Sequence, residues 1–333
     1  MTNDEQNHHV TAANYSFMYD IKTIGRCNLL KKQWFADLTL LFVAFVWGAT
    51  FVVVQNAISF LPPITFNSIR FFLAAVLLGG WLVLFQRQQI AYLNKRLLLA
   101  GFFLGLWLFF GYATQTIGLL YTSSAKAGFI TGLNVVLVPL FAFVLLKQRP
   151  GKNAVAGIVV AVIGLYLLTM TDISAFNKGD ALVFLCSIGF AMQIVLTGKY
   201  SKQFPTLLLT VVQISTVSGL SVIYAFFLED WKLALDSTVL FQPDVIFALV
   251  ITSLFATAFA FFAQTNFQKY TSPTRVALIF ATEPVFAALT GFLWAGDRLS
   301  ASAVIGCVLI LAGMILAELP IRQPKVYKSK KVS

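Results

Sequence analysis

The chain has 333 residues, of which 59% are apolar and only 11% are charged, with a formal net charge of +11. Ordinary soluble domains carry about 25% charged residues, so this composition excludes a soluble globule. It also excludes disorder for the bulk of the chain, because disorder requires low hydrophobicity and high charge.

Residues 1–37 are polar, and we expect them to form a cytoplasmic tail rather than a cleaved secretory signal, because the first long apolar run starts only near Leu38. Ten apolar segments follow, each close to the roughly 20 residues that a helix needs to cross a bilayer. Barrel strands would alternate polar and apolar residues over about 10 positions, so these runs are predicted to be helices. The predicted helices are 38–60, 64–85, 97–120, 123–146, 153–170, 181–200, 206–228, 245–267, 273–294 and 300–319.

The orientation is predicted from the Lys and Arg residues in alternate loops. If both termini are cytoplasmic, that side carries 19 of them, including those of the basic tail 320–333, and the other side carries 4. The longest loop, 229–244, is acidic and falls on the outer side. The basic loops would face an anionic inner leaflet, so the net charge needs no nucleic-acid partner.

An internal repeat becomes visible when the sequence is shifted by 149 residues. From Gln115 to Thr169 the match needs no gap, and 16 of 55 positions are identical, polar residues and glycines included. We therefore expect two five-helix repeats, 38–170 and 178–319. Because five is odd, the second repeat would enter the membrane inverted, as in many secondary transporters. The predicted fold is an all-α integral membrane protein of ten transmembrane helices in two inverted-topology repeats, although channels also use such repeats and a duplication can serve folding alone.

Several motifs accompany this duplication: VWGATF at 46–51, SIRFF at 68–72, ATQTIGLLYT at 113–122, EPVFAA at 283–288 and GDRL at 296–299. Over residues 38–319 the chain resembles EamA-type members of the drug/metabolite transporter (DMT) superfamily. Asp297, where the family often has Glu, and Asn134, at the repeat position of Glu283, depart from the pattern. The resemblance implies export of small metabolites, amino acids or drugs from the cytoplasm, usually by exchange with ions.

The sequence lacks the residues that a metal site, a redox motif or an ATP-binding site would need. The only histidines, His8 and His9, lie in the polar tail, the three cysteines form no CxxC pair, and no Walker A motif occurs. We expect no cofactor, no metal and no ATP-driven step. A membrane enzyme would need more acid–base groups than one intramembrane Glu, and a channel would need a filter motif or charge rings.

Two charged residues, Glu283 and Arg70, lie well away from the ends of their predicted helices. Glu283 is the only acid deep in a span, where a lone carboxylate is costly unless it is neutral or paired, so it is a candidate proton carrier. Its alternative role is to shape the helix together with Pro284. Arg70 could hold an anionic substrate group or pair with Glu283, or its long side chain could snorkel to the interface.

The remaining candidates are polar and aromatic residues of the spans. The amides of Asn134, Gln115 and Gln264 could contact substrate or simply bond between helices. Trp47 and Trp107 could form cavity walls or only pack in the core. Lys126 and Arg275 occupy equivalent repeat positions near Tyr121 and Tyr270, and these four residues are candidate gates or interface anchors.

The sequence thus predicts a secondary transporter of the inner or plasma membrane, with both termini cytoplasmic, that exports small metabolites such as amino acids or drug-like compounds by alternating access. Its partners would be a small-molecule substrate, the lipid bilayer and protons as coupling ion. Exchange, facilitated uptake and a homodimer remain open alternatives.

Overall fold

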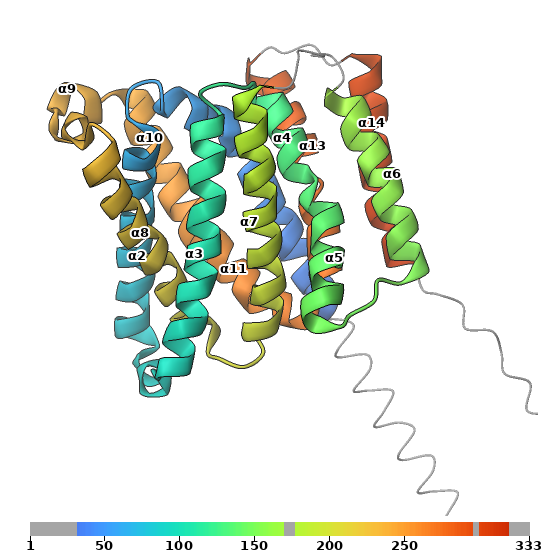
Figure 1. Ribbon diagram of the computed structural model, residues 1–333, viewed down its shortest axis with the longest axis horizontal. Coiled ribbons are helices and arrows are strands. Elements are labelled where there is room, and N and C mark those ends of the chain that lie inside the picture. The colour runs from blue at the N-terminus through green and yellow to red at the C-terminus, as the bar shows by residue number, and fades with distance from the viewer. Residues whose placement is uncertain (1–31, 170–176, 296–299, 320–333) are drawn as a thin grey trace, which may run out of the picture.

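The computed structural model describes residues 32–169, 177–295 and 300–319, and this part of the chain contains helices and turns but no strand. Eight of its helices are long and apolar enough to cross a membrane. Two shorter apolar helices, α6 (Lys152–Thr169) and α14 (Ala301–Glu318), lie where the fifth and tenth segments were predicted. The helices pack side by side in one bundle (Figure 1). The chain is therefore a multi-pass membrane protein.

The observed bounds follow the predicted segments closely. The continuous helices are Lys32–Ala57, α2 (Pro63–Phe85), α3 (Lys95–Gly118), α7 (Lys178–Tyr200) and α8 (Thr206–Leu228). The interrupted ones are α4 (Ser124–Gly132) with α5 (Asn134–Leu146); α10 (Pro243–Ile251), η3 (Thr252–Phe259) and α11 (Ala260–Phe267); and α12 (Pro273–Phe280), α13 (Glu283–Thr290) and η5 (Gly291–Ala295).

Residues 32–37, which the sequence analysis assigned to the polar tail, are helical and run without a break into the first apolar segment. In this stretch Asp37 accepts a hydrogen bond and ion pair from Arg275 at 2.7 Å. Residues 1–31, the tail 320–333 and the motif at 296–299 lie outside the described residues.

Two of the interrupted helices break at positions that the 149-residue shift aligns. One break lies between α4 and α5, immediately before Asn134, and the other between α12 and α13, immediately before Glu283. Pro284 occupies the first turn of α13 and has no backbone N–H to continue the helix from α12. Pro139 inside α5 likewise removes a helical bond close to the other break. Each break aims the start of a new helix at the middle of the bundle.

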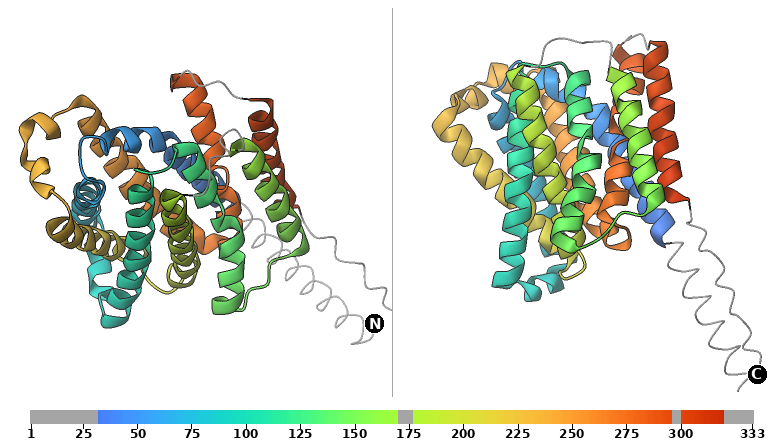
Figure 2. Two further views of the ribbon diagram at one scale, coloured as in Figure 1. Left: turned by 45° about the horizontal axis from the view of Figure 1, so that its top comes forward. Right: turned by 45° about the vertical axis from the view of Figure 1, so that its right-hand side comes forward.

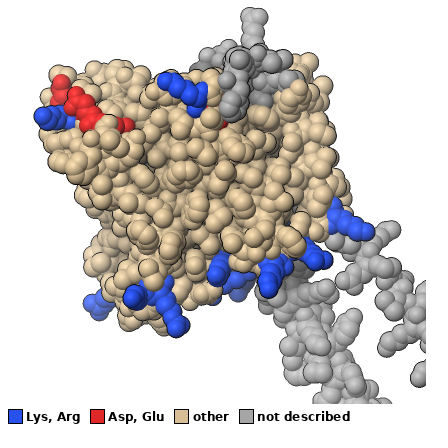
Figure 3. All heavy atoms as spheres, in the orientation of Figure 1, with Lys and Arg blue, Asp and Glu red and all other residues tan. Residues whose placement is uncertain are grey.

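Charge is distributed unequally between the two ends of the bundle (Figure 3). Lys and Arg gather where the first helix and α3 begin and α7 ends, which we call the basic face. The acidic loop that follows α8 lies at the opposite end, which we call the acidic face. There Glu229 accepts hydrogen bonds from the backbone N–H groups of Ile64 (2.9 Å) and Thr65 (2.6 Å). Its carboxylate therefore caps the start of α2, where Pro62 offers no side-chain cap.

At one edge of the bundle α6 and α14 lie along each other (Figures 1 and 2). Their contact depends on glycines. A Cβ at Gly164 would lie 2.7 Å from the carbonyl oxygen of Gly306, and one at Gly157 would clash with the carbonyl oxygen of Gly313. Close approach of the two backbones is possible only because these side chains are absent.

Candidate functional site

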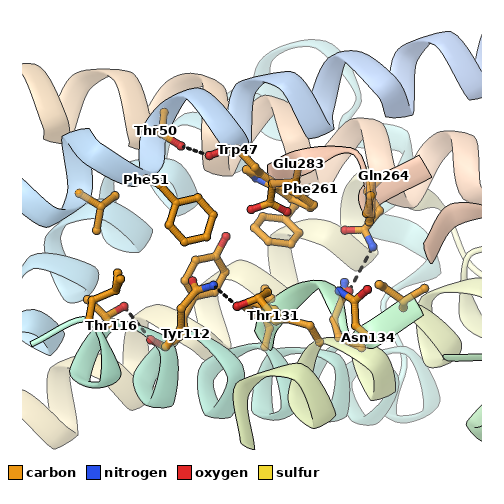
Figure 4. Close-up of a pocket in the computed structure, with 18 of the residues that line it drawn as sticks. Trp47, Thr50, Phe51, Tyr112, Thr116, Thr131, Asn134, Phe261, Gln264 and Glu283 are labelled. Carbon is orange, nitrogen blue, oxygen red and sulfur yellow. Dashed lines mark hydrogen bonds between the residues drawn. The ribbon is translucent and has the colours of Figure 1, made fainter. Parts of the chain in front are cut away.

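A cavity of about 60 Å³ lies among the helices in the middle of the bundle, which is room for a few water molecules (Figure 4). The first helix, α2, α3, α7 and α11 contribute to its wall, and so do both broken helices. Six of the seven predicted substrate-binding residues line it, namely Trp47, Arg70, Gln115, Asn134, Gln264 and Glu283. Trp107 does not; it packs against Phe110 instead.

Glu283 is the first residue of α13, and its carboxylate points into the cavity (Figure 4). The carboxylate makes no hydrogen bond or ion pair with any other residue that the structure describes, so the alternative in which it pairs with Arg70 is not seen here. The backbone at this position is tightly packed, because a Cβ at Gly48 would clash with the carbonyl oxygen of Glu283. The glycine of the 46–51 motif thus allows the first helix to approach the break that presents Glu283.

The amides form two groups around the acid. Gln264 donates to Gln193 at 3.1 Å and to Gln268 at 3.3 Å, and Gln115 donates to Thr131 at 3.2 Å. The buried oxygens Oδ1 of Asn134 and Oε1 of Gln264 have no hydrogen-bond partner among the described residues. Buried acceptors of this kind are normally satisfied by water or by a ligand. Together with Glu283 they leave the cavity rich in acceptors.

Arg70 is buried, with only 3% of its surface exposed, and so does not follow the alternative in which it snorkels to the interface. Its Nε donates to Thr257 Oγ1 at 2.7 Å, and one terminal nitrogen donates to the carbonyl of Ala256 at 3.3 Å and the hydroxyl of Tyr112 at 3.5 Å. The guanidinium also lies 4.9 Å from the centre of the Tyr112 ring. These contacts hold the cation at the cavity wall, away from either membrane face.

Two of the three hydrogen-bond partners of Arg70, Ala256 and Thr257, belong to the π-helical segment η3. There the carbonyl of Ala256 also accepts the indole N–H of Trp47 at 2.8 Å. The wider turn of a π-helix leaves carbonyl groups available for such bonds, and π-helical turns often occur at functional sites. The segment therefore fixes both a charged and an aromatic residue of the cavity.

Sequence reasoning missed the aromatic residues that complete the wall. Tyr112 and Phe261 line the cavity, and the Tyr112 hydroxyl accepts the hydrogen bond from Arg70. A helical spacing could have found Tyr112, because it precedes Gln115 by three residues and so shares its face. The sequence carries no comparable signal for Ala256, which acts through its backbone.

The predicted gating residues lie outside the central cavity, near the two faces. Lys126 forms an ion pair with Asp180 at 2.6 Å, and Arg275 forms one with Asp37 at 2.7 Å. Two tyrosines accompany them: Tyr121 lies under the amine of Lys178, 3.6 Å from its ring centre, and Tyr270 lies 5.0 Å from the amine of Lys269. Lys126 thus joins α4 to the start of α7, and Arg275 joins α12 to the first helix.

No group of three or more His, Cys, Asp or Glu side chains suited to a metal ion occurs in the part of the chain that the structure describes. The cavity holds instead one acid, one cation, several amides and many aromatic rings. Such a lining can bind an organic solute with a polar group and an apolar part.

Known proteins resemble this chain in sequence and in fold. The model of the EamA-like transporter family matches residues 34–170 and again residues 177–319. An uncharacterized transporter of Archaeoglobus fulgidus is 34% identical over 288 residues, 86% of this chain and 87% of that protein. The uncharacterized transporter YyaM of Bacillus subtilis is 27% identical over 293 residues, 86% and 94% of the two chains. A solved crystal structure with 19% identity and a TM-score of 0.69 covers 85% of this chain and 96% of its own, and shares the fold.

Proposed function

Because the chain belongs to the EamA-like transporter family, we propose that it is a secondary transporter of the inner or plasma membrane that exports small metabolites by alternating access. Amino acids and drug-like compounds are the substrates we favour. The observation that carries the proposal is the central cavity, where both broken helices present a polar residue, Asn134 or Glu283, at matching positions. Discontinuous helices that meet near the middle of the membrane are typical of transporter binding sites.

Two sets of contacts support ten helices in two inverted repeats. In the shifted alignment Gly157 corresponds to Gly306 and Gly164 to Gly313. The contacts are reciprocal, since Gly157 packs on Gly313 and Gly164 on Gly306. Reciprocal contacts of this kind are what a two-fold axis produces.

The ion pairs at the two faces follow the same rule. Lys126 and Arg275 are repeat equivalents, and each binds an aspartate at the start of the other repeat's first helix. We assign Lys126–Asp180 to the gate on the acidic face and Arg275–Asp37 to the gate on the basic face. Both pairs are formed in this structure, and the cavity between them is small. In the transport cycle one pair opens while the other stays closed.

The substrate class follows from the chemistry of the lining. Glu283 and the unpaired oxygens of Asn134 and Gln264 can accept hydrogen bonds from an amine. Aromatic side chains supply apolar surface for the rest of the molecule. The guanidinium of Arg70 retains donors that bond to no described residue, and these can meet a carboxylate. A sugar phosphate fits less well, because it would require several deep cations and Arg70 is the only one among the lining residues.

We further propose that substrate export is driven by proton entry. With the basic face in the cytoplasm, protons would enter through the acidic face and be carried by Glu283 while substrate leaves. Exchange without protons and facilitated uptake are the alternative modes. A membrane enzyme or a channel is disfavoured, because the lining offers one acid without a partner base and no ring of charges.

Metabolite profiling of the medium from overexpressing and deletion strains identifies candidate substrates, and flux into proteoliposomes tests them. We expect apolar and aromatic amino acids to compete for flux better than sugar phosphates do. The reverse ranking would indicate that the site binds an anionic substrate. Absence of any solute flux that depends on the protein would contradict transport itself.

A further inference from the structure

A second and larger pocket opens on the basic face, well apart from the central cavity. Its volume is about 430 Å³, within the range of roughly 300–1,000 Å³ that is common for small-molecule sites. It lies among the start of the first helix, the loop before α6, the starts of α6 and α12 and the end of α14. None of the described residues that line it is Asp or Glu, whereas four are cationic: Arg149, Lys202, Lys269 and Arg275.

Three of these cations have no acidic partner among the described residues. Arg149 lies 5.6 Å from the centre of the Phe143 ring, and Lys269 donates to the amide oxygen of Asn266 at 3.0 Å. Lys202 is exposed at the pocket rim. Arg275 is paired with Asp37, which does not line the pocket. Like charges converging on one hollow repel each other unless an anion lies between them.

A buried hydroxyl in the wall also points to a ligand. Thr271 lines the pocket with only 6% of its surface exposed, and its Oγ1 has no hydrogen-bond partner among the described residues. Exposed Ser272 and half-buried Thr274 add hydroxyl groups beside it. A buried hydroxyl without a partner costs free energy, and an acceptor oxygen brought by a ligand would satisfy it.

We propose that this pocket binds a phosphate group, held by the ammonium groups of Lys202 and Lys269, the guanidinium of Arg149 and the hydroxyl of Thr271. Phosphate oxygens accept hydrogen bonds from all of these groups, and Arg can engage two oxygens at once. This site shares no lining residue with the central cavity, so it is separate from the site proposed for the transport substrate.

The phosphate can come from an anionic lipid or from a soluble phosphate compound. The lipid is favoured by position, because the pocket lies at a membrane face and its inner wall includes the apolar side chains of Leu278 and Met314. Basic pockets between helices at such a face typically receive lipid headgroups. Arg275 also lines the pocket, so a bound phosphate would compete with Asp37 for it and loosen the basic-face contact.

Thermal unfolding of the purified full-length protein in detergent tests the site. The probes are dihexanoyl phosphatidylglycerol, dihexanoyl phosphatidylcholine and inorganic phosphate, each titrated separately. The double variant Lys202→Gln, Lys269→Gln removes two pocket cations. The matched control Lys95→Gln, Arg96→Gln removes two exposed cations of the same face that do not line the pocket.

We expect phosphatidylglycerol to raise the unfolding temperature of the wild type and of the control variant alike. Each pocket cation is worth about fivefold in affinity, so the pocket variant should bind roughly 25-fold more weakly. Thr271→Val should weaken binding further while leaving the charge unchanged. Stabilisation by inorganic phosphate alone, lost in the pocket variant, would support the site with a soluble ligand as its source. Equal weakening in both double variants, or no stabilisation by any phosphate probe, would overturn the proposal.

Discussion

The two ion pairs offer the sharpest mechanical prediction, because their disruption should bias the transporter in opposite directions. Asp180 is fully buried and accepts from Lys126 (2.6 Å), from Thr122 Oγ1 (2.7 Å) and from the backbone N–H of Asn177 (2.9 Å). Breaking a buried ion pair costs about 3–5 kcal/mol. Asn at this position keeps one acceptor oxygen, so Asp180→Asn should destabilise the closed acidic face by about 2–3 kcal/mol.

The pair on the basic face should matter less. The side chains of Arg275 and Asp37 are 25% and 16% exposed, so water screens them more than it screens the Lys126–Asp180 pair. We expect Asp37→Asn to cost about 1 kcal/mol. Since 1.4 kcal/mol corresponds to a tenfold change, opening should rise roughly 30- to 140-fold for Asp180→Asn and about fivefold for Asp37→Asn.

A reporter cysteine at Thr50, in the cavity wall, measures which face is open. The native cysteines are first replaced, and a membrane-impermeant maleimide is then applied to one face at a time. Asp180→Asn should speed labelling from the acidic face and slow it from the basic face, and Asp37→Asn should do the reverse. Asp244→Asn, exposed in the first turn of α10, serves as the control and should change neither rate. If both gate variants shift labelling in the same direction, or neither shifts it, the gate assignment is wrong.

The other predictions concern packing, the buried cation and topology. Gly164→Ala should lower stability by about 1–2 kcal/mol in a chemical unfolding assay, because the new Cβ would lie 2.7 Å from a backbone oxygen of α14. Gly219→Ala, with nothing within 4 Å of the new Cβ, should be neutral or stabilising, and equal losses would refute the packing argument. Arg70→Lys should abolish flux with little loss of expression, since an ammonium cannot reproduce the forked contacts to η3; unchanged flux would remove Arg70 from the site. An alkaline phosphatase fusion at Asp236 should be active and one at the C-terminus inactive, and the opposite pattern would invert the orientation.

Hydropathy predicted the helices well because each must present apolar side chains to lipid over a fixed length. The eighth predicted segment, 245–267, is helical from end to end, as expected. Its middle is π-helical at Thr252–Phe259, and no periodicity in the sequence reveals that change. Hydrogen bonds from other helices accompany this change of helix type, because the carbonyl of Ala256 accepts hydrogen bonds from both Arg70 and Trp47.

The cavity-lining residues could be predicted where they are of types that seldom occur inside membrane-spanning helices. A lone Glu, a lone Arg and repeated amides stand out in apolar helices, and Glu283, Arg70 and Gln264 all line the cavity. Tryptophans do not stand out in this way, because packing uses them equally well, and Trp107 faces away from the site. The acidic partners of Lys126 and Arg275 were also missed, because pairing between distant helices leaves no local pattern.

In the proposed transport cycle the carboxylate of Glu283 carries the coupling proton. The most direct measurement is flux of an identified substrate in proteoliposomes with and without a pH gradient, for wild type, Glu283→Gln and the exposed control Asp244→Asn. We predict that the gradient accelerates flux by wild type and by the control, whereas Glu283→Gln folds normally and shows no acceleration. Equal rates for wild type and Glu283→Gln under both conditions would contradict the account.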